Sequence, residues 1–135
     1  MLLTPYLHFA GHAEEALNFY KDALGGEVQM LSRYGDSPVQ ADPDYKDKIL
    51  HSRLVFGNNM IMISDSFKGN PVSTGGNIQL NVSMDDVSEM EKVFNKMAAG
   101  GNVKMPLGRQ FWGATFGMLT DKFGVSWMFN VEDKK

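Results

Sequence analysis

The sequence contains an internal repeat. Residues 13–30 read AEEALNFYKDALGGEVQM, and residues 88–105, seventy-five positions later, read SEMEKVFNKMAAGGNVKM, with eight of the eighteen aligned positions identical. In both copies apolar residues recur at helical spacing, a Gly-Gly pair follows, and the pattern then alternates as in a strand. Each copy therefore predicts a helix that ends at the glycine pair and leads into a strand.

The likeness extends to both sides of the two helices. A short strand precedes each helix (LTPYLHF and IQLNVSM), and a hairpin follows each (HSRLVFGNNMIMIS and ATFGMLTDKFGVSWMFN). We therefore predict one α+β domain, 1–135, made of two βαβββ modules, 1–67 and 77–132. The Gly/Ser/Thr/Pro-rich linker 68–76 joins them. One helix covers one face of a sheet, so we expect a curved mixed sheet with a concave pocket on its other side.

Composition narrows the classes of function. The 135 residues suit a single domain, and a net charge of −3 gives no basic surface for nucleic acid or acidic membrane. There is no cysteine, which excludes disulfides and thiolate chemistry and fits a cytoplasmic location. No apolar run approaches the roughly 20 residues that span a bilayer, and the first residues do not resemble a signal peptide. We expect no nucleic-acid or membrane partner.

Alternation in the first hairpin separates two faces. One face is wholly apolar and suits packing under a helix; it consists of Leu54, Phe56, Ile61 and Ile63. The other face is mixed and suits a pocket wall; it consists of His51, Arg53, Val55, Met60, Met62 and Ser64. By contrast, the polar, proline-broken segment 36–49 predicts a mobile loop near the pocket entrance.

Several side chains are candidates for a site. His51 is the best candidate for a catalytic residue, since imidazole exchanges protons near neutral pH, although a hydrogen-bonded structural histidine is the alternative. Arg53 could bind a carboxylate or phosphate, or pair with an acidic neighbour. Phe111 and Trp112 could stack on a flat ligand or pack in the core. The predicted ligand-binding residues are Tyr6, His8, His51, Arg53, Met62, Ser64, Phe111, Trp112 and Met128.

The paired βαβββ modules resemble the vicinal oxygen chelate superfamily, which includes glyoxalase I, bleomycin resistance proteins and extradiol dioxygenases. The segments TPYLHFAGHAEEALNFYKDALGGEV, LHSRLVFGNNMIMISD and TDKFGVSWMFN are similar to its PhnB-like branch. The resemblance implies a glyoxalase-like fold and a homodimer. PhnB-like proteins often carry a ubiquinone methyltransferase name. We do not expect that activity, because no glycine-rich loop follows a strand to bind S-adenosylmethionine.

The resemblance also implies four metal-ligand positions, one on the first and one on the last strand of each module. They fall near Pro5, Ser64, Asn77 and Met128, none of which is a histidine or a carboxylate. Ordinary divalent ions need imidazole or oxygen ligands, so we expect no metal or other cofactor. The leading hypothesis is a metal-independent protein of this family that binds a small apolar or aromatic molecule.

The alternative hypothesis is a lyase, isomerase or dioxygenase with a rearranged metal site. Such a site would hold Ni, Zn, Mn or Fe between His8, His51 and Asp65. Alternation places Asp65 on the face opposite His51 unless a bulge redirects its side chain.

Overall fold

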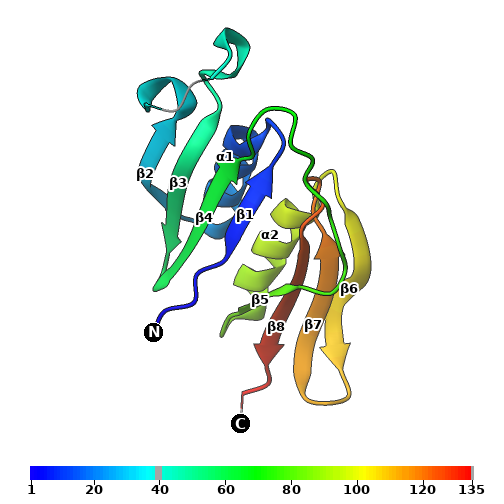
Figure 1. Ribbon diagram of the computed structural model, residues 1–135. Helices are drawn as coiled ribbons and strands as arrows, with labels where there is room; N and C mark the ends of the chain where they lie inside the picture. Colours follow the sequence, from blue (N-terminus) through cyan, green and yellow to red (C-terminus); the bar gives the residue numbers. More distant parts are fainter. Residues whose placement is uncertain (39–40, 135) are drawn as a thin grey trace. The chain divides into compact units, whose positions relative to one another are not determined.

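The computed structural model describes residues 1–38 and 41–134, and it confirms an α+β fold of two βαβββ modules (Figure 1). The chain divides into two compact units, Met1–Ser73 and Thr74–Lys135. The division falls within the segment predicted as the linker. The two units are called the first and the second module below, and each is described by itself.

Both modules have the same strand order. In the first, the sheet order is β1-β4-β3-β2, with β1 parallel to β4 and the other neighbours antiparallel. In the second, the order is β5-β8-β7-β6 with the same directions. The first module contains β1 (Tyr6–Phe9), α1 (Ala13–Leu24), β2 (Glu27–Arg33), β3 (Ile49–Phe56) and β4 (Asn59–Asp65). The second contains β5 (Leu80–Ser83), α2 (Val87–Ala98), β6 (Asn102–Gln110), β7 (Ala114–Thr120) and β8 (Ser126–Glu132).

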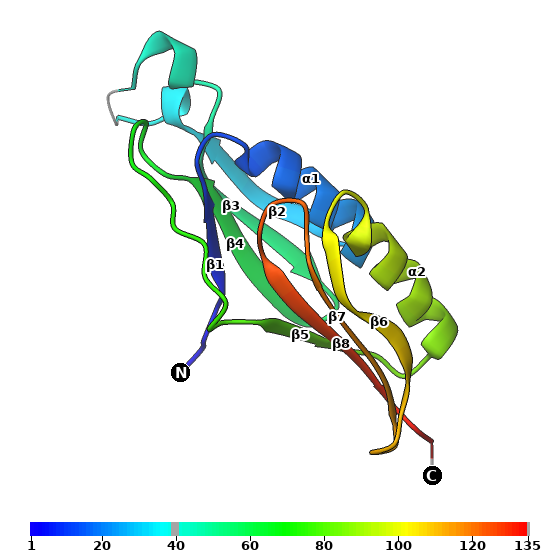
Figure 2. The same ribbon diagram turned by 90° about the vertical axis from the view of Figure 1, so that its right-hand side faces the viewer.

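Helix α1 covers one face of the first sheet (Figure 2). Its buried side chains recur at helical spacing and are Ala13, Ala16, Leu17, Tyr20 and Ala23. The sheet face that is buried with them carries Leu54, Ile61 and Ile63, all 4% exposed or less. Leu54 pairs with Ile61, and Arg53 pairs with Met62, so the two faces predicted from alternation are confirmed.

The repeated glycine pair has two separate functions. Gly25 and Gly100 have φ of 70° and 74°, the left-handed conformation in which each helix ends. The second glycine of each pair instead lets two backbones approach closely. A Cβ on Gly26 would lie 2.8 Å from the carbonyl oxygen of Val55, and one on Gly101 would lie even closer to that of Thr120. One glycine is needed for its dihedral angle, the other because it has no side chain.

The two helices begin differently. Asp86 caps α2, and its carboxylate accepts the backbone N–H groups of Ser88 and Glu89. In the described structure the side chain of His12 does not cap α1. The N–H groups of Gly11 and Ala13 are bonded instead by Asp65, which is fifty-two residues or more away along the chain. This long-range cap has no local sequence signal.

The segment predicted as a mobile loop, 36–49, is anchored over its described part. It contains a 3-10 helix, Pro43–Tyr45, and follows another, Tyr34–Asp36. The hydroxyl of Tyr34 donates to the carbonyl of Asp65 at 2.8 Å, and that of Tyr45 donates to Ser66 O at 2.6 Å. The described part of the segment is therefore held by hydrogen bonds to the end of β4, while its mobility and its place near a pocket entrance stay predictions; positions 39 and 40 lie outside the described residues. Two buried tyrosines, Tyr45 within this polar stretch and Tyr34 just before it, connect it to the end of β4.

Candidate functional site

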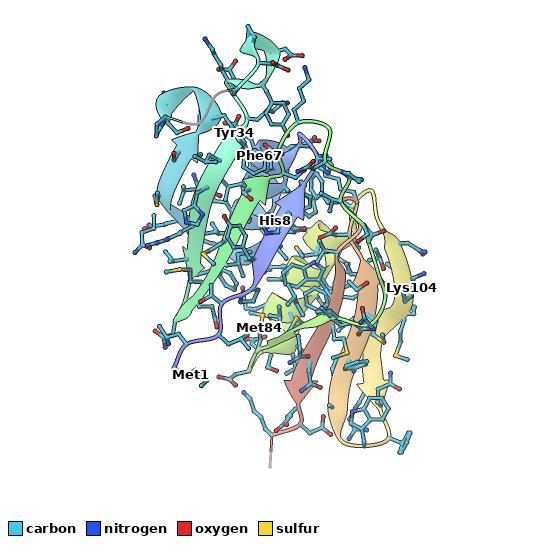
Figure 3. The ribbon with its side chains drawn as sticks, viewed as in Figure 1. Met1, His8, Tyr34, Phe67, Met84 and Lys104 are labelled. Atoms are coloured by element: carbon cyan, nitrogen blue, oxygen red, sulfur yellow. The ribbon has the colours of Figure 1, made fainter. Side chains whose placement is uncertain are left out.

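A cluster of polar and aromatic side chains lies on the face of the first sheet that α1 does not cover. We call Tyr6, His8, His51, Arg53 and Ser64 the β1–β3–β4 cluster. The strand register explains it: Tyr6 lies beside Met62, Met62 beside Arg53, and His8 beside Ser64. In Figure 3, His8 is labelled on β1, with α1 behind the sheet as in Figure 1. Alternate residues of three strands thus place these predicted residues on one surface.

The rings of the cluster contact one another. Tyr6 and His8 are stacked, with ring centroids 4.3 Å apart and planes 16° from parallel. The hydroxyl of Tyr6 is 2.8 Å from Nδ1 of His51, whose ring meets the tyrosine ring edge-on at 5.6 Å. Nδ1 of His8 is 2.9 Å from the hydroxyl of Ser64, which is only 3% exposed. The two histidines are therefore held in fixed orientations by neighbours from other strands.

The proton arrangement follows from Arg53. Its Nε, which can only donate, is 3.4 Å from Nε2 of His51, so that nitrogen accepts. The proton of the neutral imidazole then resides on Nδ1 and is donated to the oxygen of Tyr6. Burial, and secondarily the positive charge of Arg53, lowers the pKa of His51 below its ordinary value of 6.5, which favours this neutral ring. The hydroxyl hydrogen of Tyr6 is consequently available to a ligand.

Arg53 provides the remaining donors of the cluster. The side chain is exposed, and its two terminal guanidinium nitrogens bond to none of the described residues. The nearest carboxylate in register on this face is Glu27, opposite Val55, and it forms no ion pair with Arg53 within the described structure. The cluster therefore offers a guanidinium and a phenol as donors, next to the face of a stacked tyrosine–histidine pair.

Asp65 does not join this cluster. It is 2% exposed, on the opposite face of β4, and pairs in register with the buried Phe9. One carboxylate oxygen accepts Gly11 N and Ala13 N, and the other accepts Ile49 N at 2.9 Å. The three-ligand set of His8, His51 and Asp65 is thus not assembled. Among residues 1–38 and 41–134 there is no group of three or more His, Asp or Glu side chains arranged to hold a metal.

Met62 lies between Tyr6 and Arg53 on the face that carries the cluster, and the remaining predicted ligand-binding residues belong to the second module. Phe111 and Trp112 form the turn between β6 and β7 and are 94% and 51% exposed, so neither packs in the core as the alternative held. Trp112 meets Phe116 edge-on at 5.7 Å. Met128 lies on β8 beside Met118.

One residue of the first sheet face was missed from the sequence. Met30 on β2 pairs with Arg53, so it extends the row that runs through Met62 to Tyr6. The register shifts between Val28 and Met30, and such a bulge moves the following side chains to the other face. Alternation counted along β2 therefore does not assign this methionine, and the sequence shows no local signal for the bulge.

Comparison with known proteins agrees with this architecture. Residues 2–129 match the family described as 3-demethylubiquinone-9 3-methyltransferase. The chain is 33% identical to Protein YjdN of Escherichia coli K12 over 141 positions, covering 97% of this chain and 95% of YjdN. Among solved structures, protein PA1353 from Pseudomonas aeruginosa is 43% identical with a TM-score of 0.90, covering 99% of both chains. The PhnB protein from Bacillus cereus is 31% identical with a TM-score of 0.83, covering 97% of this chain and 99% of that one.

The chain therefore belongs to the family described as 3-demethylubiquinone-9 3-methyltransferase, which includes PhnB-like proteins such as that of Bacillus cereus. The fosfomycin resistance protein FosX from Listeria monocytogenes has the same fold, with a TM-score of 0.69 at 11% identity. The match covers 98% of this chain and 93% of FosX, and at 11% identity it shows a shared fold alone. None of the described helices is long and apolar enough to cross a membrane.

Proposed function

We propose that this protein binds a small organic molecule on the β1–β3–β4 cluster without the help of a metal. The observation that carries the proposal is the bonding of His51. Tyr6 and Arg53 occupy both of its ring nitrogens, while the phenolic hydrogen and the terminal guanidinium nitrogens stay free to donate. Held by their neighbours, these donors are oriented before a ligand arrives, which lowers the entropy lost on binding.

The donors and rings define the class of ligand. An apolar or aromatic body would lie against the stacked rings of Tyr6 and His8 and the thioether of Met62. A carboxylate or another oxygen acceptor would be bound by the guanidinium of Arg53 and the hydroxyl of Tyr6. We propose Ser64 as the residue that orients His8 in this site.

Binding of benzoate, with benzamide as its uncharged analogue, tests this proposal. Chemical-shift titration should place benzoate at the cluster, and Arg53→Gln should weaken it about tenfold while changing benzamide little, because a charge-assisted hydrogen bond contributes about 1.5–3 kcal/mol. Arg109→Gln in the second module is the matched control, since Arg109 already pairs with Asp133. Equal effects of the two substitutions would refute the site.

A metal titration of the chelator-stripped protein separates the proposal from the alternative. We expect Ni²⁺, Zn²⁺, Mn²⁺ and Fe²⁺ to bind no more tightly than to a surface histidine. Tight binding of one ion per chain that His51→Ala abolishes would overturn the metal-independent proposal, and assays for lyase, isomerase and dioxygenase activity, with His51 as the candidate base, would follow.

Two further residues and three further properties are part of the proposal. Phe111 and Trp112, which lie on the second module, would stack on an aromatic ligand. Quenching of Trp112 fluorescence would detect this contact. We propose that the protein is a cytoplasmic homodimer, as the family resemblance and the absence of cysteine suggest, and that it does not transfer methyl groups. Cell fractionation tests the location, light scattering tests the oligomeric state, and S-adenosylmethionine titration tests the absence of methyl transfer.

A further inference from the structure

The second module contains a cavity of its own. Its volume is about 580 Å³, within the range of small-molecule sites, and its polar wall includes Thr74, Gly75, Gly76, Lys104, Thr120 and Ser126. All lining residues belong to the second module, so none is shared with the β1–β3–β4 cluster. Lys104 is labelled on β6 in Figure 3.

Among the described residues that line the cavity, Lys104 is the one charged side chain. Lys104 is exposed and forms no ion pair with any residue of the described structure, and no aspartate or glutamate is among the described residues that line the cavity. The hydroxyls of Thr120 and Ser126, paired across β7 and β8, lie 3.5 Å apart, and the amide of Gln79 adds a further polar group. An ammonium and several hydroxyls without a carboxylate favour an anion.

Glycines shape the part of the wall that the entering segment and the β7–β8 turn form. Gly124 has φ of 90°, and a Cβ there would lie 3.3 Å from the side chain of Thr74, so the segment that enters the module passes close to the β7–β8 turn. A Cβ on Gly76 would meet no atom within 4 Å. At Gly76 the wall is therefore bare backbone bordering open space, which an added side chain could fill.

The two copies of the repeat carry their charge at different places. Lys104 corresponds to the uncharged Gln29, seventy-five residues earlier. In the first module Arg53 lies between Met30 and Met62, whereas in the second Met118 lies between Met105 and Met128. Met118 also lines the cavity, so the ammonium of Lys104 is combined here with a thioether surface.

From these observations we propose that the second module has its own site for an organic anion. The apolar body of the ligand contacts Met118, and its anionic group is bound by Lys104 with the hydroxyls of Thr120 and Ser126. The site does not depend on the function proposed for the first module.

Two dyes with a similar aromatic body test this proposal. The probes are 1-anilinonaphthalene-8-sulfonate, which carries a sulfonate, and N-phenyl-1-naphthylamine, which does not. Fluorescence titrations are done in an Arg53→Gln background, so that the β1–β3–β4 cluster contributes no guanidinium. We expect Lys104→Gln to weaken the sulfonate dye about tenfold, as a lost charge-assisted bond predicts, and to leave the neutral dye unchanged.

The matched control is Lys92→Gln, on α2, where the lysine is exposed and pairs with Glu89. It should leave both dyes unaffected. Gly76→Leu provides a second test, because a side chain in the open space should reduce binding of both dyes. Amide shifts of Gly75, Gly76 and Gly124 on adding the sulfonate dye should locate it.

The proposal is overturned if Lys104→Gln and Lys92→Gln have equal effects, or if the sulfonate dye shifts amides elsewhere. It is also overturned if Lys104→Gln weakens both dyes alike, since that indicates apolar adsorption. The first module is judged separately, by the effect of Arg53→Gln on benzoate.

Discussion

The buried carboxylate of Asp65 should be one of the most sensitive positions of the first module. It holds the segment before α1 and the start of β3 through three backbone amides, those of Gly11, Ala13 and Ile49, at 2.8, 2.9 and 2.9 Å. Asp65→Ala leaves these donors without the acceptor, and a buried unsatisfied donor costs about 1–3 kcal/mol. Because Gly11 is only partly buried and can bind water, we expect a total loss of about 4 kcal/mol of unfolding free energy.

Asp65→Asn should be milder. Its remaining oxygen can keep the bonds to Gly11 and Ala13, but its NH₂ group then faces the N–H of Ile49, donor against donor. Losing that single bond should cost about 2 kcal/mol. Turning the amide over does not help, because both oxygens of Asp65 accept bonds in the native protein. The unfolding free energy should therefore decrease in the order wild type, Asp65→Asn, Asp65→Ala, because each side chain in this order can keep fewer of the bonds.

Urea unfolding provides the measurement. Far-UV circular dichroism follows both modules, whereas tryptophan fluorescence follows only the second, which contains Trp112 and Trp127, the two tryptophans of the chain. Asp44→Asn is the control, since this carboxylate is exposed and pairs with Lys68; it should leave the midpoint unchanged. A cost below about 1 kcal/mol for Asp65→Ala would refute this account of the carboxylate. A divalent ion that stabilises the wild type but not Asp65→Asn would make Asp65 a metal ligand instead.

The two glycines of the first pair should differ in the unfolding free energy that is lost on substitution in the same urea experiment. Gly25→Ala should lose about 1–2 kcal/mol, because it forces an alanine into the left-handed conformation. Gly26→Ala should lose more, because its Cβ would lie 2.8 Å from a carbonyl oxygen. If the two losses are equal, the close approach is not what requires the second glycine. Tyr45→Phe should cost about 1 kcal/mol by removing one hydrogen bond to the main chain, measured from the urea midpoint. Because the pKa of His51 is lower in the folded protein than its ordinary value of 6.5, the unfolded chain takes up the proton at a higher pH. The contribution of the neutral ring to the unfolding free energy is therefore fully present above pH 6.5 and is lost as the pH falls from 6.5 through the lowered pKa. His51→Gln should flatten that decline, and Arg53→Gln should raise the pKa of His51 in an NMR titration; an unchanged pKa would exclude the charge of Arg53 as a cause.

The fold could be predicted because its signals are local and occur twice. Helical spacing, the glycine pair and the hairpin turns each extend over a few residues, and their recurrence after seventy-five positions shows that the chain repeats one module. Alternation along β3 and β4 is equally local. It placed His51, Arg53, Met62 and Ser64 on one face before the strand order was known.

The structure of the site depends on contacts that no local pattern encodes. The bond between Tyr6 and His51 joins residues forty-five apart, and it forms because β4 lies between β1 and β3 in the sheet. The bulge before Met30, the tyrosines that anchor 36–49 and the three amides on Asp65 likewise depend on which strands and loops become neighbours. The sequence alone determined the modules and the faces of their strands, because backbone geometry alternates side chains within each strand. Only the tertiary structure determined which donors on those faces are occupied and which stay free, because hydrogen bonds depend on distances between strands remote in sequence.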